Sequence, residues 1–301
     1  DIIRVGEDYY LAGTTMHSVP GLVVLHSKDL VNWEFSSYCF DRFDDSDDFN
    51  LRNGKEAYGQ GIWAPAIRYH NGKFYIFSNI NGHGLQVYIS DSAKGPWTHH
   101  KVNGDIYDLS VLFDEDGKIY AVHKYGNVTV TELKPDLSGP VEGSSKVVIP
   151  EGNAMGEGHH VYKINGMYYI LSADYSPMGR MQCARSKSIW GPYETCVISE
   201  RESYGYAAGW SVGNMGIGRP LPEDGFSFQN NKPNGLNLGC ATIHQGGIVQ
   251  APDGKWWGVS MQDFNAVGRT VCLSPITWVD GWPYFGLEKN LGRSPRTWFK
   301  P

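Results

Sequence analysis

The feature of this sequence that most constrains its fold is a short turn-and-strand pattern that occurs five times. In each copy a glycine stands beside an acidic or amide residue, and large, mostly aromatic residues follow. The copies read GEDYYL from Gly6, NGKFYIF from Asn71, DGKIYAV from Asp116, NGMYYIL from Asn165 and DGKWWGV from Asp253. Asn-Gly and Asp-Gly are favoured in two-residue hairpin turns because both central positions need a positive φ. Since aromatic and β-branched residues favour strands, the pattern predicts five β-hairpins.

A second pattern follows four of these hairpins, and it consists of a polar turn that ends in Trp or Tyr. The copies are SKDLVNW from Ser27, SDSAKGPW from Ser90, SKSIWGPY from Ser186 and SPITWVDGW from Ser274. Repeated four-stranded units of about 40–50 residues indicate a β-propeller. We therefore predict an all-β, five-bladed β-propeller that forms one domain over residues 1–301, with few helices. The alternative is a β-sandwich with repeated Asn-Gly turns.

Composition and charge limit the classes of ligand that the protein could bind. The formal net charge is −6 and basic clusters are absent, which argues against nucleic acid or an anionic membrane as a partner. No apolar run reaches the ~18 residues of a membrane-spanning helix. Aromatic residues make up 13% of the chain, beside 37 glycines and 16 prolines. We expect a neutral ligand, and aromatic faces are suited to stacking on sugar rings.

Two carboxylates precede predicted inner strands in neighbouring blades. Glu157 stands between Gly156 and Gly158, ahead of a strand of alternating large residues, and Asp108 precedes the apolar strand Ser110–Phe113. The innermost strands of a propeller line its axis, so both side chains are predicted to point there. Carboxylates held close together keep one of them protonated, and such a group acts as a general acid.

The order of these motifs, with GIWAPAIRYH and HQGGIV between them, resembles glycoside hydrolase family 43 over the whole chain. The resemblance implies a five-bladed propeller that removes xylose or arabinose from plant polysaccharides with inversion of configuration. By position, Glu157 corresponds to the general acid, and Asp108 corresponds to the acid that tunes and orients it. Family members usually have Asp-Pro-Ser where this chain has Asp-Leu-Ser, and the carboxylate is kept.

The general base is harder to assign. In the family it is the first Asp of a motif resembling Asp-Pro-Asp-Ile-Ile-Arg, and this chain starts at the second Asp, which is Asp1. The resemblance therefore puts the base two residues upstream of Asp1. The alternative is that Asp1 itself serves. An inverting mechanism needs acid and base carboxyls about 6.5–9.5 Å apart, with the attacking water between them.

Three further residues are predicted to bind substrate. Trp63 would offer an aromatic wall to the sugar, and the alternative is that it packs between blades. By resemblance, Arg269 reaches sugar hydroxyls, and the alternative is a surface salt bridge. His17 lies in a loop after the first inner strands, where a pocket role and a structural role are equally compatible with its position.

One histidine near the axis, His244, is a candidate metal ligand. A lone His in a β core is often a hydrogen-bonded structural residue. By resemblance, however, His244 would bind a hydrated calcium ion at the axis, with water supplying most of the oxygen ligands that calcium prefers. No organic cofactor is expected. Strand alternation puts His159 at the pocket rim and His160 in the core.

The resemblance is strongest to the β-xylosidase and α-L-arabinofuranosidase branch. We therefore expect an exo-acting, inverting glycosidase that acts on xylo-oligosaccharides or arabinoxylan. The alternatives are a non-hydrolytic carbohydrate-binding propeller, which the missing base would favour, and an endo-arabinanase, which would need an open groove. Relatives often continue into a C-terminal β-sandwich, which we expect outside this chain. A secreted or periplasmic location fits plant-wall substrates, and a cytoplasmic location is also workable.

Overall fold

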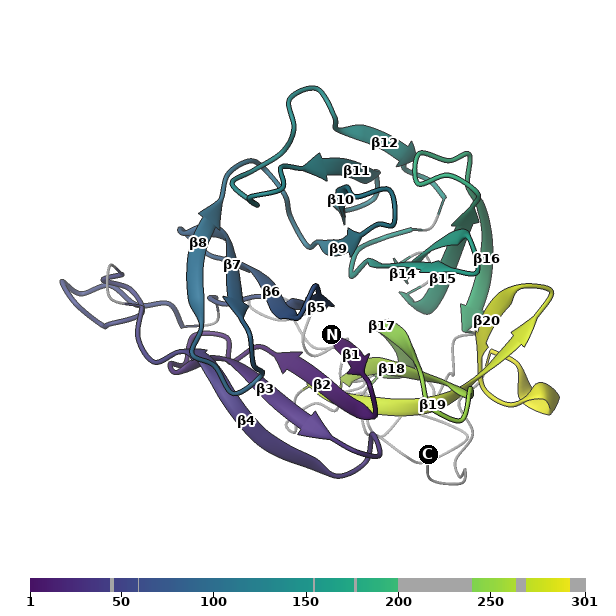
Figure 1. Cartoon of the computed structure of the whole chain (residues 1–301), viewed down its shortest axis with the longest axis horizontal. Coiled ribbons are helices and arrows are strands. Elements are labelled where there is room, and N and C mark those ends of the chain that lie inside the picture. Colours follow the sequence, from purple (N-terminus) through teal and green to yellow (C-terminus); the bar gives the residue numbers. More distant parts are fainter. Residues whose placement is uncertain are drawn as a thin grey trace, which may run out of the picture.

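A computed structural model of the chain describes residues 1–43, 46–58, 60–153, 155–175, 178–199, 240–263 and 269–292. In these ranges the protein is built from five four-stranded antiparallel sheets, arranged around a central axis as a five-bladed β-propeller (Figure 1). The one described helical element is the short 3-10 turn η3 (Glu288–Asn290). In the described part of the chain, no helix is long and apolar enough to cross a membrane. The predicted fold class and the scarcity of helices are confirmed.

Each blade uses four strands that are consecutive in the sequence. Blade I comprises β1 (Ile2–Val5), β2 (Asp8–Gly13), β3 (Gly21–Ser27) and β4 (Trp33–Phe40). Blade II comprises β5 (Ala66–His70), β6 (Lys73–Ile80), β7 (Gly84–Ser90) and β8 (Thr98–Val102). Blade III comprises β9 (Ser110–Phe113), β10 (Ile119–His123), β11 (Val128–Leu133) and β12 (Lys146–Ile149). Blade IV comprises β13 (His160–Ile164), β14 (Met167–Tyr175), β15 (Met178–Ser186) and β16 (Glu194–Ser199). Blade V comprises β17 (Cys240–Gln250), β18 (Trp256–Asp263), β19 (Arg269–Val279) and β20 (Trp282–Phe285).

The five predicted hairpins join the first and second strands of the five blades. The turns Asn71–Gly72 and Asn165–Gly166 have a positive φ at both positions, as a two-residue turn requires. The prediction is wrong for Asp116 and Asp253, where only the following glycine has a positive φ. These two hairpins have longer loops, so their acidic residue does not occupy a left-handed turn position.

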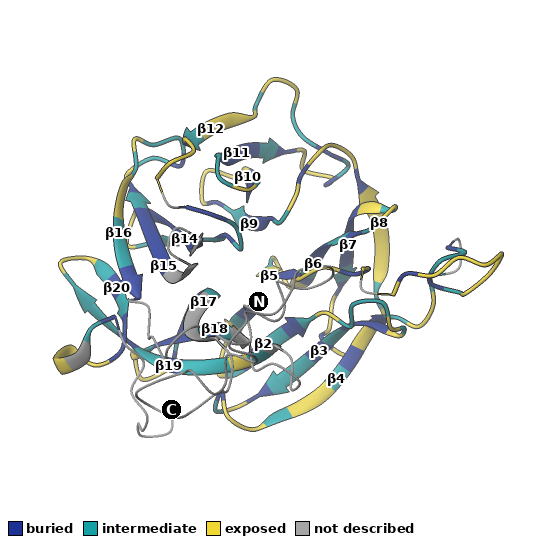
Figure 2. Ribbon diagram, turned by 180° about the vertical axis from the view of Figure 1, so that it is seen from behind, coloured by how far each residue is buried: buried dark blue, intermediate teal, exposed yellow. Residues whose placement is uncertain are grey.

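The second repeated pattern marks the turn from the third to the outermost strand in three blades. Ser27, Ser90 and Ser186 each end the third strand of their blade. The fourth copy is displaced, because Ser274 lies inside β19 and the turn comes later, at Asp280–Gly281. The outermost strands β4, β8, β12 and β16 each expose residues to solvent, as β8 shows clearly (Figure 2).

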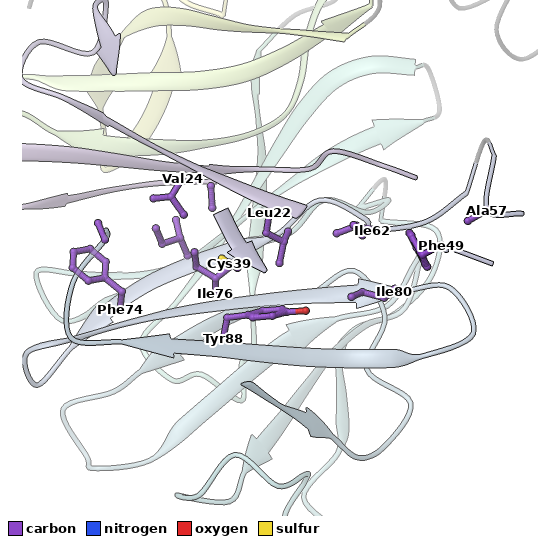
Figure 3. Close-up of a cluster of buried hydrophobic side chains, with 13 residues drawn as sticks. Leu22, Val24, Cys39, Phe49, Ala57, Ile62, Phe74, Ile76, Ile80 and Tyr88 are labelled. Atoms are coloured by element: carbon purple, nitrogen blue, oxygen red, sulfur yellow. The ribbon is translucent and has the colours of Figure 1, made fainter. Parts of the chain in front are cut away.

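Hydrophobic clusters fill the spaces between neighbouring blades. Figure 3 shows the cluster between blades I and II, where Leu22 and Val24 face Ile76 and Tyr88. Comparable clusters lie between the other neighbouring pairs of blades. Because these side chains are removed from water on folding, packing between blades is the main source of stability.

The ring closes without a strand shared by the first and last blades in the described chain. Instead, Ile2 and Tyr9 of blade I pack against Val249 and Trp257 of blade V. The first strand of each blade lies nearest the axis (Figure 1). Residues just before these strands are therefore brought together from distant parts of the sequence.

Polar contacts near the axis also join the inner strands. Arg68 of β5 donates to the Asp1 carboxylate and to the Ser110 hydroxyl of blade III. The Ser110 Oγ in turn accepts a 3.0 Å hydrogen bond from the Val161 amide of blade IV. Arg68 thus ties β5 to Asp1 at the start of blade I and to β9 of blade III, and Ser110 extends the network to β13 of blade IV.

Candidate active site at the propeller axis

The backbone around Glu157 is anchored to the neighbouring strand β14. The Glu157 carbonyl accepts hydrogen bonds from the Ala173 amide at 2.9 Å and from Ser172 Oγ at 3.2 Å. The Gly156 amide donates to the Ala173 carbonyl at 2.7 Å. Gly158 has a φ of 68°, a left-handed conformation that glycine adopts without strain. The flanking glycines thus allow a tight, fixed turn that presents the Glu157 side chain just before β13.

Each oxygen of the Glu157 carboxylate has a different hydrogen-bond donor. Tyr107 Oη donates to Oε2 at 3.3 Å, and Gln245 Nε2 donates to Oε1 at 3.1 Å. Partial burial, together with the nearby carboxylates of Glu157 and Asp108, raises the pKa of Tyr107 to about 12. The phenol therefore keeps its proton near neutral pH and remains a donor.

The Asp108 side chain contacts the backbone of the turn that carries Glu157. Asp108 Oδ2 accepts a 2.6 Å hydrogen bond from the Gly158 amide, and the Asp108 amide donates to Asn79 Oδ1 at 3.1 Å. Burial raises the pKa of Asp108 above its ordinary value, and the hydrogen bond from Gly158 opposes that rise. The structure thus brings together the two acids that the sequence singled out.

The Asp1 carboxylate is engaged by the polar contacts described above. Its carboxylate is 3% exposed and accepts hydrogen bonds from Arg68 Nη1 and from the amides of Ile2 and Ile67, at 2.8 and 3.2 Å respectively. His160 Nε2 lies 3.5 Å from Asp1 Oδ1. A carboxylate neutralised by a buried arginine is a weak proton acceptor. This geometry argues against Asp1 as the general base.

Trp63 lies close in the structure to the acidic pair, because Asn79 connects the two. The Trp63 amide donates to the Asn79 carbonyl at 2.9 Å, and Asn79 Oδ1 accepts from the Asp108 amide. Trp63 is 36% exposed, so the residue is accessible from solvent. His17 lies in a turn nearby, with its ring 4.9 Å from that of Tyr58 and its buried Nδ1 without a hydrogen-bond partner in the described part of the chain.

Two predicted site residues can be placed only by strand register. Arg269 begins β19 opposite Asp263, and His244 lies in β17 opposite Met261. The side chains of Arg269 and His244 lie outside the described part of the chain. Among the described residues, no group of three or more His, Cys, Asp or Glu side chains is arranged to hold a metal. The roles of Arg269 and His244 stay predictions, as does calcium.

The two histidines after Glu157 differ from expectation. His159, expected at the pocket rim, is buried, and its Nε2 is 2.6 Å from the Lys124 carbonyl. His160, expected in the core, is partly buried beside Asp1 at the axis. The prediction is wrong for His159 because it has the same alternation parity as Val161, which is buried between blades III and IV, so this face of the chain is packed against the neighbouring blade.

Three contributors to the site were not found from the sequence: Asn79, Tyr107 and Gln245. Tyr107 immediately precedes Asp108, and Gln245 immediately follows His244 in HQGGIV. Both adjoin residues that had been singled out, and this adjacency was the available signal. Their pairing with Glu157 depends on packing between blades, which no local pattern encodes.

Comparison with known proteins agrees with this geometry. The sequence model of glycosyl hydrolases family 43 matches residues 1–206. The chain is 31% identical to a putative beta-xylosidase of Xylanibacter ruminicola, over 100% of this chain and 52% of that protein. It is 34% identical to a non-reducing end alpha-L-arabinofuranosidase of Bacteroides ovatus, over 95% and 51% respectively. The chain thus spans about half the length of the curated relatives it matches.

The fold is also found in solved structures. One of them, described as a bifunctional GH43-CE protein of Bacteroides eggerthii, superimposes with a TM-score of 0.79 at 33% identity, covering 98% of this chain and 34% of that one. The family match extends over two thirds of the chain and includes both Asp108 and Glu157. The chain therefore belongs to glycosyl hydrolase family 43.

Proposed function

We propose that the protein is an exo-acting, inverting glycoside hydrolase that releases xylose, arabinose or both from the non-reducing ends of oligosaccharides. The observation that carries the proposal is the fixed Glu157 carboxylate at the axis, with Asp108 bonded to the same turn. Family membership supports the reaction class. The names of the two relatives, a beta-xylosidase and a non-reducing end alpha-L-arabinofuranosidase, support the sugars and the exo mode.

In the proposed reaction Glu157 is the general acid. It gives its proton to the glycosidic oxygen while the bond from that oxygen to the anomeric carbon breaks. A water attacks the opposite face of the anomeric carbon and passes a proton to the general base. By resemblance, that base is an Asp two residues upstream of Asp1, and the Asp1 end of the described chain lies close to the axis (Figure 1).

Substrate binding falls to residues around the acidic pair. The part-exposed Trp63 would stack on the sugar, and Arg269 and His17 would contact its hydroxyls. A hydrated calcium ion held by His244 remains part of the proposal by resemblance, and no proton transfer above depends on it.

The proposal is tested with xylo-oligosaccharides and arabinose-substituted xylo-oligosaccharides. We expect monosaccharide release from the non-reducing end, with proton NMR detecting the inverted anomer first. A first product with retained configuration would contradict inversion. Internal cleavage would support an endo-acting enzyme, and binding without hydrolysis would support a carbohydrate-binding propeller.

A further inference from the structure

Tyr58 lies in a turn whose backbone is anchored on both sides. Ala57 is buried in the hydrophobic cluster between blades I and II (Figure 3), and its carbonyl accepts a 3.0 Å hydrogen bond from the Gln60 amide. The Gly61 amide donates to Asn81 Oδ1 at 2.8 Å, and the Gly61 carbonyl accepts from the Asn81 amide at 3.0 Å. Tyr58 is nevertheless 75% exposed, so its side chain is accessible from solvent. A large aromatic residue thus stands open to solvent on a fixed segment of backbone.

The loop that carries His17 is held against this segment by backbone contacts. The Met16 carbonyl accepts a 2.9 Å hydrogen bond from the Ile62 amide, and the Ile62 carbonyl accepts one from Thr14 Oγ1. A Cβ on Gly61 would lie 2.4 Å from the Met16 carbonyl oxygen, and Gly61 has a φ of 125°, so this position needs glycine. The close approach of the two segments therefore fixes where the His17 ring lies.

The rings of His17 and Tyr58 are in contact across the two segments. Their centroids are 4.9 Å apart and their planes are tilted by 53°. His17 Nδ1 is buried without a hydrogen-bond partner in the described part of the chain, so a hydrogen bond to this atom does not orient the ring. Ring packing does so instead, and the same contact supports the Tyr58 ring from one side.

This aromatic pair adjoins the acidic pair through Trp63. The Trp63 amide donates to the Asn79 carbonyl at 2.9 Å, and Asn79 Oδ1 accepts from the Asp108 amide at 3.1 Å. Along this series of contacts, Tyr58 is farther from the acidic pair than Trp63 is. The proposed function puts the sugar that is released at Trp63. A sugar ring stacked on Tyr58 would therefore belong to another unit of the same oligosaccharide.

We propose that Tyr58, supported by His17, is the aromatic platform of a second sugar subsite, which binds a pentose unit other than the one that is released. The inference rests on the proposed function. A tyrosine side chain offers a large, rigid contact area at low entropic cost, and here its backbone is fixed before the sugar arrives. The subsite adds affinity for an oligosaccharide over a single sugar, and it takes no part in bond cleavage.

The test compares a ligand of four sugars with a ligand of one. The substrate is xylotetraose or its arabinose-substituted form, whichever the wild type cleaves. The one-sugar ligand is the monosaccharide released from it, measured as a competitive inhibitor. Tyr58→Ala should raise KM for the substrate about three- to tenfold, the range for one aromatic contact. Because the contact is equal in the ground and transition states, kcat should not change. The inhibition constant of the monosaccharide should change by less than about twofold.

Two further variants separate sugar stacking from structural support. Tyr58→Phe keeps the ring, so its KM should stay within about twofold of the wild-type value. Tyr38→Ala is the matched control, because Tyr38 is also exposed and its ring also lies 4.9 Å from a neighbouring ring, that of Phe35, but on the outer strand β4. It should change neither KM nor the inhibition constant. Since neither constant depends on the folded fraction of a preparation, partial misfolding of a variant cannot mimic the result.

Three results would overturn the second subsite while leaving the proposed function standing. They are an unchanged KM for Tyr58→Ala, an equal rise in KM and in the inhibition constant, and a KM for Tyr58→Phe as high as that for Tyr58→Ala. A wild-type protein that releases no monosaccharide from either tetrasaccharide would overturn the proposed function and this inference with it. The wild-type measurement alone therefore distinguishes the two failures.

Discussion

Asp108 accepts a 2.6 Å hydrogen bond from the backbone amide of Gly158, the residue directly after the proposed general acid. Asp108 itself has a φ of 52°, a left-handed conformation that is uncommon for residues other than glycine and that Asp tolerates better than most. The contact fixes the backbone beside Glu157 and therefore the direction in which the Glu157 side chain points. Asp108 thus orients the acid through the main chain, in addition to any effect of its charge.

Replacement of Asp108 by Asn should therefore impair catalysis more than folding. The variant keeps an acceptor oxygen but loses the charge that strengthens the bond to Gly158, and its amide can rotate a donor toward the turn. We expect kcat to fall about 10- to 100-fold, in proportion to a lost charged hydrogen bond. Asp105→Asn is the control, since the Asp105 side chain is 91% exposed. A kcat for Asp108→Asn within twofold of wild type would contradict the orienting role.

Trp63 is predicted to act in binding rather than in bond cleavage. The residue is part-exposed while its backbone is fixed to Asn79, so Trp63→Ala removes a binding surface and leaves the acidic pair in place. Loss of binding that is equal in ground and transition states raises KM and leaves kcat unchanged. We expect KM to rise about tenfold. Phe35→Ala, at an exposed position of the outer strand β4, should change neither constant, and a lower kcat for Trp63→Ala would exclude a purely binding role.

Arg68 is predicted to be important for stability. Arg68→Met would leave the Asp1 carboxylate, 3% exposed, without its cation, and would also break the bonds to blade III. Breaking a buried ion pair from one side costs about 3–5 kcal/mol. Urea unfolding measures the free energy. Lys73→Met, which breaks the exposed pair with Asp91, should cost under about 1 kcal/mol, and a similarly small cost for Arg68→Met would refute the prediction.

The pH dependence of stability should reveal buried neutral histidines. Burial lowers the pKa of both His123 and His159 to about 4, from an ordinary value of 6.5. The unfolded chain therefore binds more protons than the folded one below pH 6.5. The stability from these groups is fully present above pH 6.5 and is lost as the pH falls toward 4.

The slope of the unfolding free energy against pH shows whether His159 is one of these groups. Each such histidine contributes up to about 1.4 kcal/mol per pH unit within this window. His159→Gln keeps a donor for the Lys124 carbonyl and removes the titrating group. Its free energy of unfolding, measured in urea between pH 7 and 5, should fall less steeply with decreasing pH than that of the wild type. The difference in slope should be up to about 1.4 kcal/mol per pH unit, which corresponds to one proton. Parallel curves would show that His159 is not buried as a neutral group.

The repeated hairpins were sufficient to predict the five-bladed fold, because turn chemistry and strand preference are local properties. The same logic located Asp108 and Glu157, since both stand directly before inner strands. Gln245 and Asn79 could not be found this way, because their contacts with the acidic pair arise only when separate blades pack. The turns at Asp116 and Asp253 differed because loop length, rather than the Asp-Gly pair, sets their backbone conformation.

The central claim is that Glu157 is the proton donor of a glycosidase, and one comparison tests it most directly. Wild-type protein and Glu157→Gln are assayed on the oligosaccharide that the wild type cleaves fastest, with the melting temperature of each recorded. The account predicts that kcat falls by about 10²–10⁴-fold, the range for general acid catalysis, while the melting temperature stays the same. Hydrolysis by Glu157→Gln at a rate within tenfold of the wild type would contradict the account.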